Sequence, residues 1–328
     1  MKAVIPMAGL GTRMRPHTYS RPKPLITVAG QPMLKHLIDA LRPLDIEEYV
    51  FIVGYLGDQI EAYIRSTYDF KATFVVQEEL IGQAHAVYLA RQHLDGPLIV
   101  LFADTLFEAD LSVIHTTDAD AIAFVKEVED PRRFGVVELD AEGRVTRFTE
   151  KPDSMENRNA VIGLYYIRDS QAMLRAIEKQ MARRQMTKGE FYLADAFQVM
   201  IDDGAVFRTQ RVDVWLDCGK PETVLETNRY LLEHGHDNSA EVSRPDVTII
   251  PPVYIHPEAN LQYAIIGPHA TIAAGCQISN SIIRDSIVEE GARVCNAILD
   301  QSLIGREAQV VGRYFTLNVG DASSIDFS

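Results

Sequence analysis

The most informative part of the chain is its beginning, where residues 2–25 read KAVIPMAGLGTRMRPHTYSRPKPL. The apolar run at residues 3–7 predicts a buried first strand. A turn with Gly9 and Gly11 follows, and glycine lets backbone N–H groups approach a ligand and form a concavity that binds anions. Residues 1–38 contain six Lys or Arg and no Asp or Glu, although the whole chain has a formal net charge of −14. Backbone donors beside fixed cations are what a polyphosphate requires, so this stretch predicts a phosphate-binding loop.

Three interpretations of this loop compete. A P-loop would need the pattern Gly-x-x-x-x-Gly-Lys-Ser/Thr, which is absent. A dinucleotide-binding fingerprint would need a third glycine where this chain has Met14. A plain surface turn is the usual meaning of a lone Gly-x-Gly pair, but it does not account for the nearby cations Arg13 and Lys23.

Composition restricts the class of protein. The 328 residues allow two domains, and the acidic net charge argues against a nucleic-acid-binding surface. The three cysteines are far apart and lack a Cys-x-x-Cys pair, which indicates neither a disulfide framework nor a zinc site and fits a reducing compartment. The apolar runs are strand-sized, and the one at the start is too short for a signal peptide. We therefore expect a cytoplasmic protein with no nucleic-acid partner and no membrane partner.

The pattern of apolar residues after the loop alternates between helical and extended spacing. It predicts helices at 33–41, 58–68 and 82–94, and strands at 49–53, 72–76 and 97–103. This alternation is typical of an α/β fold, with a Rossmann-like, mixed but mostly parallel sheet flanked by helices. Further strands are expected at 121–125, 135–139, 144–149 and 205–214, and further helices at 171–184, 190–202 and 221–234.

Asp104 follows the strongly apolar run at 97–103. In parallel sheets ligands bind beyond the carboxyl ends of the strands, which is where this residue is expected. A turn or cap carboxylate is the ordinary alternative. Because Mg²⁺ prefers one or two carboxylates together with phosphate oxygens and water, the basic loop elsewhere favours Asp104 as a metal ligand.

The last third of the chain has a different pattern. Ile266, Ile272 and Ile278 place an aliphatic residue at every sixth position, and the repeat continues less regularly to Val310. This hexapeptide repeat is the signature of a parallel β-helix, in which stacked coils form a continuous core. We expect a domain at 1–240 and a β-helix domain with a tail at 241–328. Packing and homo-oligomerisation are the roles expected of the β-helix, and its His256 and His269 are expected at the surface.

The motif Gly-x-Gly-Thr-Arg-Met-x-Pro, followed by Pro-Lys-Pro-Leu, resembles the signature of the sugar-1-phosphate nucleotidyltransferases. The resemblance is greatest to the long form of glucose-1-phosphate thymidylyltransferase, and it extends to the tail at residues 318–324. That family has two consecutive glycines where this chain has Ala8-Gly9, and related uridylyltransferases share the alanine. The resemblance also implies that the β-helix is left-handed.

The resemblance implies a role for each matching residue near the nucleotide. The triphosphate loop would be formed by Ala8, Gly9, Leu10, Gly11 and Thr12. Arg13 and Lys23 would be the catalytic cations. Gln77 and Gly82 match residues that contact the base, although Gln77 taken alone would be read as a solvated loop residue.

The second substrate site is implied in the same way. Glu150 and Lys151, in Glu-Lys-Pro, match residues that bind the sugar and its phosphate, whereas a bare Glu-Lys pair is usually a surface ion pair. Gly135 and Gly163 match glycines that line the sugar pocket. Asp217, in Trp-Leu-Asp-Cys-Gly, matches the second metal carboxylate and would hold Mg²⁺ together with Asp104.

The expected activity is Mg²⁺-dependent transfer of a nucleoside monophosphate from an NTP to a sugar 1-phosphate, with release of pyrophosphate. The expected substrates are dTTP or UTP and glucose 1-phosphate. One alternative is a non-catalytic subunit that binds a sugar nucleotide and regulates or scaffolds a partner. A further alternative is a bifunctional enzyme with acyltransferase activity in the β-helix.

Overall fold

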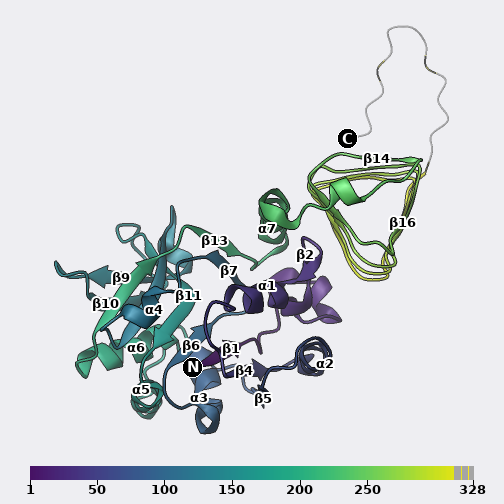
Figure 1. The fold of residues 1–328 in the computed structure, drawn as a ribbon. Helices are drawn as coiled ribbons and strands as arrows, with labels where there is room; N and C mark the ends of the chain where they lie inside the picture. The colour runs from purple at the N-terminus through teal and green to yellow at the C-terminus, as the bar shows by residue number, and fades with distance from the viewer. Residues whose placement is uncertain (314–318, 320–323, 325–328) are drawn as a thin grey trace. The chain divides into compact units, whose positions relative to one another are not determined.

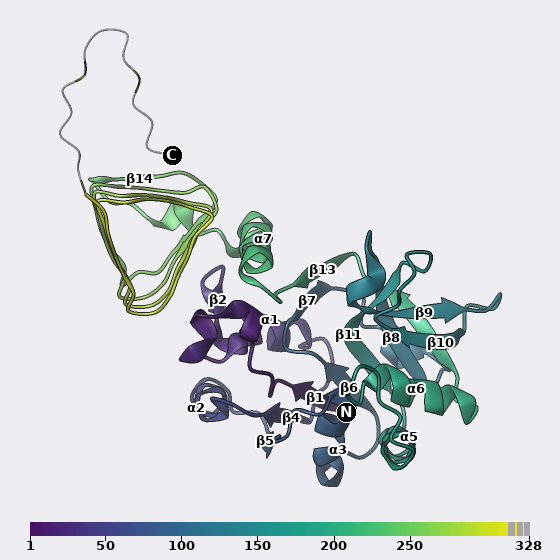
Figure 2. The same ribbon diagram turned by 180° about the vertical axis from the view of Figure 1, so that it is seen from behind.

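The computed structural model describes residues 1–313, 319 and 324, so most of the tail noted above lies outside the described residues. The chain forms two compact units (Figures 1 and 2). Unit 1 contains Met1–Ile26 and Gln31–Thr227, and unit 2 contains Thr27–Gly30 and the chain from Asn228 onward. The division into folding domains at residue 240 stays a prediction. Within the described part of the chain, no helix has both the length and the apolarity needed to cross a bilayer.

The central sheet of unit 1 confirms the mixed, mostly parallel α/β architecture. Its strand order is β10 (Val145–Glu150), β9 (Gly135–Leu139), β11 (Asn159–Ile167), β6 (Leu98–Leu101), β1 (Lys2–Pro6), β4 (Glu48–Val53) and β5 (Ala72–Val76). Strands β6, β1, β4 and β5 run parallel, and β11 lies antiparallel to β6. Off this path, β8 (Ala121–Glu127) pairs with β11 and with β12 (Phe207–Arg211). The short strand β3 (Gln31–Pro32) precedes the first helix.

The helices of unit 1 bury apolar residues, and the helical spacing of apolar residues predicts all of them except the shortest. They are α1 (Met33–Ala40), α2 (Gly57–Thr67), α3 (Gln83–Leu89), α4 (Val113–Thr116), α5 (Ser170–Ala182), α6 (Leu193–Asp202) and α7 (Pro221–Leu231), the last of which runs on to unit 2. Asp169 caps α5 by accepting a hydrogen bond from the Gln171 N–H at 2.9 Å.

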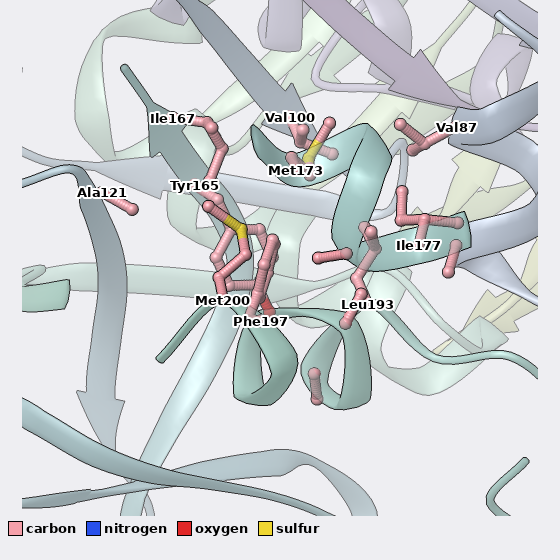
Figure 3. Packing of buried hydrophobic residues seen from close by; sticks show 14 of the residues in the cluster. Val87, Val100, Ala121, Tyr165, Ile167, Met173, Ile177, Leu193, Phe197 and Met200 are labelled. Carbon is pink, nitrogen blue, oxygen red and sulfur yellow. The ribbon is translucent and has the colours of Figure 1, made fainter. Parts of the chain in front are cut away.

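The core between the sheet and helices α5 and α6 contains a cluster of aromatic rings among aliphatic side chains (Figure 3). Tyr165 of β11 and Phe197 of α6 have ring centroids 4.8 Å apart, and Phe207 of β12 lies 5.5 Å from Phe197. Met173 and Ile177 of α5 complete the packing. Because such aromatic contacts stabilise beyond their buried area, they fix β11, which forms the floor of the site described below.

Helix α6 begins three residues later than the pattern predicts. The Phe191 N–H donates to the Ile81 carbonyl, and the Ala84 N–H donates to the Phe191 carbonyl, both at 2.9 Å. These bonds hold the segment before α6 in an extended form. Gly82 has φ +121°, and a Cβ there would lie 2.4 Å from the Phe191 oxygen, so this close approach requires glycine.

The expected strand at 205–214 is divided in two. Strand β12 ends at Arg211, after which the Asp213 N–H bonds to the Glu108 carbonyl and the chain leaves β8. Strand β13 (Val214–Asp217) then pairs antiparallel with β7 (Thr105–Glu108), a strand that the sequence did not indicate. This two-stranded sheet places Asp217 opposite Thr105.

Unit 2 is a β-helix built from three parallel sheets of short strands, as the repeat predicts (Figure 1). The sheets are β14 (Val247–Ile249), β17 (Ala264–Ile266), β20 (Ile282–Arg284) and β23 (Ile298–Asp300); β15 (Val253–Ile255), β18 (Ala270–Ile272), β21 (Ile287–Val288) and β24 (Leu303–Ile304); and β16 (Asn260–Gln262), β19 (Gln277–Ser279), β22 (Arg293–Cys295) and β25 (Gln309–Val311). Corner residues such as Asn280, Asp285 and Asn296 have positive φ, which Asn and Asp tolerate better than most residues. The left-handedness of the helix stays a prediction.

Candidate active site

The loop that follows β1 lines a cavity of about 520 Å³ in unit 1. Of the predicted nucleotide-binding residues, the cavity is lined by Ala8, Gly9, Gly11, Thr12, Gln77 and Gly82, together with Arg13, Lys23 and Asp104. Leu10 is 39% exposed and does not line it. A Cβ at Gly9 would meet no atom within 4 Å, so open space lies over the loop backbone.

Gly11 determines the shape of this loop. It has φ +60°, and a Cβ there would lie 3.0 Å from the Thr18 methyl group. Its carbonyl accepts hydrogen bonds from the Thr18 hydroxyl and from the Met14 N–H, both at 2.8 Å. Because side chains rarely adopt this backbone conformation, glycine is required for the turn that carries Arg13 into the cavity.

Lys23 and Asp104 form an ion pair in the cavity, with Nζ donating to Oδ2 at 2.8 Å. The Asp104 side chain is 37% exposed and that of Lys23 is 12% exposed. Burial disfavours the charged form of Asp104, but the charge and hydrogen bond of Lys23, aided by Arg13, outweigh burial and lower the pKa of this carboxyl. Asp104 is therefore ionised at neutral pH and can act as an anionic ligand.

A second cavity of about 230 Å³ shares Arg13, Phe102 and Asp104 with the first, so the two adjoin at these residues. The predicted sugar-phosphate residues Gly135, Glu150, Lys151 and Gly163 all line it, as does Asp217. Gly135 and Gly163 both allow close packing. A Cβ at Gly135 would lie 3.0 Å from Glu150 Oε2, and one at Gly163, which has φ +84°, would lie 2.6 Å from the Phe102 ring.

Lys151 has an unusual backbone conformation, with φ +48°. Its N–H donates to the Phe134 carbonyl at 3.0 Å, and its ammonium donates to the Tyr192 hydroxyl at 2.6 Å and lies 3.9 Å from Glu150 Oε1. A left-handed conformation outside glycine is strained, and such strain is concentrated at functional sites. In this conformation Lys151 lines the second cavity.

Glu150 lies beside Lys151 with its side chain 13% exposed. Burial raises the pKa of this carboxyl, and the charge of Lys151 only partly opposes the shift. As a buried acceptor that is costly to leave unpaired, Glu150 is suited to bind hydroxyl groups of a ligand.

The two predicted metal ligands are brought together by the small sheet of β7 and β13. The Cys218 N–H donates to the Asp104 carbonyl at 3.0 Å, and Asp217 pairs in register with Thr105. A Cβ at Gly219 would lie 2.8 Å from Asp217 Oδ1 and 3.2 Å from the Arg13 guanidinium. Within the described residues no group of three or more His, Cys, Asp and Glu could hold a metal. Two carboxylates that line one cavity nevertheless fit Mg²⁺, which takes its other ligands from substrate and water.

Sequence reasoning missed several residues that line the second cavity. Arg133 approaches Asp217 Oδ2 at 4.0 Å, and the Trp215 ring lies 4.7 Å from the Phe134 ring. Trp215 has a buried indole N–H with no partner within the described residues. The position of Trp215 two residues before Asp217 was the one available signal.

The structure also shows a contact for each of the two β-helix histidines. His256 accepts a hydrogen bond from the Glu258 N–H, and His269 contacts Glu233 at 2.7 Å.

Comparison with known proteins identifies the family of the chain. The sequence model of the family described as "Nucleotidyl transferase" matches residues 2–234. The chain belongs to this family. It is 29% identical to the low-salt glycan biosynthesis nucleotidyltransferase Agl11 of Haloferax volcanii over 94% of each chain. It is also 29% identical to a glucose-1-phosphate thymidylyltransferase of Streptomyces griseus, over 94% of this chain and 93% of the relative.

A solved structure shows the same nucleotidyltransferase fold. A Bacillus anthracis protein described as a glucose-1-phosphate thymidylyltransferase, in complex with sucrose, superposes with a TM-score of 0.62 at 25% identity. The match covers 70% of this chain and 94% of the other. The chain is therefore an enzyme, a nucleotidyltransferase.

Proposed function

We propose that this nucleotidyltransferase uses Mg²⁺ to transfer a nucleoside monophosphate from dTTP or UTP to glucose 1-phosphate, releasing pyrophosphate. The observation that carries the proposal is the pair of adjoining cavities that share Arg13 and Asp104. One has a glycine-rich loop and two cations, as a triphosphate requires. The other has an ammonium and a buried carboxylate, as a phosphorylated sugar requires.

In the proposed reaction, an oxygen of the sugar phosphate attacks the α-phosphorus in line. A new P–O bond forms there, the bond from the α-phosphorus to the bridging oxygen breaks, and pyrophosphate leaves with the electron pair. The chain positions both substrates and neutralises charge, and no covalent enzyme intermediate is required. Mg²⁺, held by Asp104 and Asp217, would neutralise phosphate charge when bound.

The cations have separate roles in this scheme. Arg13 stabilises the triphosphate and the leaving pyrophosphate, Lys23 balances charge at the α-phosphate, and Lys151 binds the phosphate of the sugar. Asp104 orients the Lys23 ammonium through their 2.8 Å contact. Glu150 accepts hydrogen bonds from sugar hydroxyls.

Selection of the base is assigned to Gln77 and the neighbouring backbone. Gln77 is 6% exposed, and its amide nitrogen donates to the Gly82 carbonyl at 3.3 Å, which orients the side chain along the cavity wall. A side-chain amide satisfies both a donor and an acceptor edge of a pyrimidine. Thymine and uracil share that edge, so we propose both dTTP and UTP.

The test measures pyrophosphate release while crossing dTTP, UTP, GTP, CTP and ATP with several sugar 1-phosphates, with and without Mg²⁺. We expect the highest kcat/KM with a pyrimidine NTP and glucose 1-phosphate, and no pyrophosphate release after Mg²⁺ is removed by a chelator. Nucleotide binding without pyrophosphate release across the panel would favour a regulatory subunit. Consumption of an acyl-CoA with an amino-sugar phosphate would show an added acyltransferase.

We also propose that the chain forms a homo-oligomer through the β-helix. On the sheet β14-β17-β20-β23, Ile265, Ile282 and Ile298 are in register, and their neighbours Ile266, Ile283 and Leu299 form the inward row. The first three therefore point outward, and Ile298 is 75% exposed. A row of outward-facing isoleucines, two half-buried and one exposed, supports an interface, and the adjacent ion pair of Arg284 and Asp300 offers both charges to a second copy.

A further inference from the structure

A short segment from the beginning of the chain, Thr27–Gly30, is part of unit 2. It includes strand β2 (Thr27–Val28). Val28 and Ala29 are fully buried, and Thr27 is 7% exposed. Nothing in the proposed reaction uses this segment directly, yet it follows Lys23 by only a few residues.

Glu289, which follows β21 of the β-helix, holds the first residue of this segment. Its Oε1 accepts a hydrogen bond from the Thr27 N–H at 2.7 Å, and its Oε2 accepts one from the Thr27 hydroxyl at 2.8 Å. Glu289 is 3% exposed. A buried carboxylate is costly unless it accepts strong hydrogen bonds, so both donors of Thr27 are firmly committed to it.

The backbone of Glu289 is fixed by neighbouring coils. Its N–H donates to the Ile304 carbonyl at 2.9 Å, and its carbonyl accepts from the Cys276 thiol at 3.2 Å. The carboxylate is thus presented by three successive levels of the β-helix rather than by a loose loop. A rigid support is what a positioning contact needs.

Two more contacts hold the other end of the segment. The Ala29 N–H donates at 2.9 Å to Asn228 Oδ1, which also accepts from the Thr271 hydroxyl at 2.7 Å. Gly30 has φ +82°, and a Cβ there would lie 2.4 Å from the Tyr254 ring. The segment is therefore gripped from Thr27 to Gly30 by side chains of unit 2.

The connection from this segment back to Lys23 is stiff. Lys23–Leu25 forms a 3-10 turn, and the Ile26 N–H donates to the Lys23 carbonyl at 3.1 Å. Pro22 and Pro24 fix two of the backbone φ angles on either side of Lys23. Residues 24–26 are buried. The stretch between Lys23 and Thr27 is therefore short and restricted in its backbone conformation.

We propose that Glu289 is a positioning residue for the nucleotidyl transfer, which acts by holding Thr27 and thereby fixing the place of Lys23 against Asp104. The β-helix would then have a part in catalysis without contributing a group that touches substrate. This inference rests on the role proposed for Lys23. A misplacement of about 1 Å can lower turnover by about a hundredfold. The hydrogen bonds that hold Thr27 can therefore affect turnover as much as a direct contact with substrate does.

The experiment measures steady-state kinetics of the full chain with Glu289→Ala, Thr27→Val and Thr27→Ser. We expect the first two to lower kcat by about ten- to a hundredfold, with little change in KM for the sugar 1-phosphate, because Lys23 acts at the triphosphate. Thr27→Ser keeps both donors and should retain turnover. Glu290→Ala is the matched control, because this adjacent glutamate is exposed and pairs with Arg306 at the surface.

A double-mutant cycle distinguishes positioning from general support of the fold. In a Lys23→Ala background, Glu289→Ala should cause no further loss, since the group that it positions is gone. An equal fold-loss in both backgrounds, or a loss with Glu290→Ala as large as with Glu289→Ala, would overturn the inference. If Glu289→Ala does not fold, Thr27→Val takes its place in the cycle. A wild-type chain that releases no pyrophosphate would refute the proposed function, whereas an active wild type with an additive cycle refutes only this inference.

Discussion

The two lysines of the site, Lys23 and Lys151, are held in place by different contacts. We therefore expect changes to these contacts to affect different kinetic constants. Lys23 is held by a 3-10 turn and an ion pair with Asp104, whereas Lys151 is held by a strained backbone and a neutral hydroxyl. The first arrangement ties a cation to a prospective metal ligand. The second leaves the charge of Lys151 available to an incoming phosphate.

Replacing either member of the Lys23–Asp104 pair should be severe. We expect Lys23→Ala or Asp104→Asn to lower kcat for pyrophosphate release by at least about a hundredfold. The first removes a cation that stabilises the transition state, and the second removes a negative charge that would hold Mg²⁺ and orients Lys23. Lys35 and Asp39 form a similar ion pair at 2.7 Å on α1, and neither residue lines either cavity, so Lys35→Ala is the matched control. A folded Lys23→Ala protein with near-normal turnover would remove the assignment.

Tyr192 should affect the sugar phosphate alone. Tyr192→Phe removes the hydroxyl that orients the Lys151 ammonium, and we expect KM for the sugar 1-phosphate to rise about three- to tenfold, the size of one hydrogen bond. The KM for the NTP should stay constant. Tyr88→Phe loses a comparable hydroxyl contact, to Glu178 at 3.0 Å, and serves as the control. An unchanged sugar-phosphate KM would mean that the hydroxyl does not orient Lys151.

The motif residues Lys23, Asp104 and Lys151 could be predicted from sequence, and the structure places them around adjoining cavities. Tyr192, Arg133 and Trp215 could not. Their contribution depends on which strands and loops meet, and an aromatic residue beside a strand looks the same in sequence whether it fills the core or lines a cavity.

At the scale of elements, one buried carboxylate joins three neighbouring parallel strands. Glu48 begins β4, is 3% exposed, accepts from the Thr73 hydroxyl of β5 at 2.6 Å, and contacts Lys2 of β1 at 3.5 Å and Lys71 at 2.9 Å. Burial raises the pKa of Glu48, but Thr73, Lys71 and Lys2 outweigh burial, so that the pKa lies below the ordinary value of 4.5.

The sign of that shift predicts how stability varies with pH. A carboxylate with a lowered pKa in the folded state contributes stability that is fully present above the unfolded value and is lost as pH falls through the folded value. We expect Glu48→Gln to lower the free energy of unfolding by about 1–3 kcal/mol at neutral pH. Thermal melts should show the gap from wild type narrowing below about pH 4.5.

The control for Glu48 is its neighbour. The Glu47 side chain is 75% exposed and contacts the terminal amine, so Glu47→Gln should change the melting temperature little. A gap between Glu48→Gln and wild type that stays constant down to acidic pH would contradict the prediction.

Most elements of the chain could be predicted from apolar spacing, but the sheet of β7 and β13 could not. The apolar pattern continues from β12 toward Asp217 without a break. In the structure the Asp213 N–H bonds to the Glu108 carbonyl, and the chain there leaves β8 and pairs with β7. The local pattern of apolar residues indicates which residues are buried. Which strand a segment pairs with depends on residues far away in the sequence. That choice is what brings Asp217 beside Asp104.

At the scale of the molecule, the outward-facing Ile265, Ile282 and Ile298 of the β-helix predict that the chain forms a homo-oligomer. We expect Ile298→Lys to reduce the molecular mass measured by light scattering to that of a single chain, because a buried ammonium would be desolvated at the interface. Gln277→Lys adds the same charge on the polar sheet β16-β19-β22-β25, where Gln277 is exposed, and should leave the mass unchanged. A wild-type protein that is a single chain at micromolar concentration would contradict the proposal.

The hold of Glu289 on Thr27 also has a consequence for biosynthesis. The two residues are 262 positions apart, so a ribosome adding about 5–20 residues per second completes the partner roughly 13–52 s after it has made the first. Throughout that interval the segment beside Lys23 lacks its contact with Glu289, although its partners Asn228 and Tyr254 are made earlier. An enzyme that depends on this contact reaches full activity only after Glu289 has been made and its coil of the β-helix has formed.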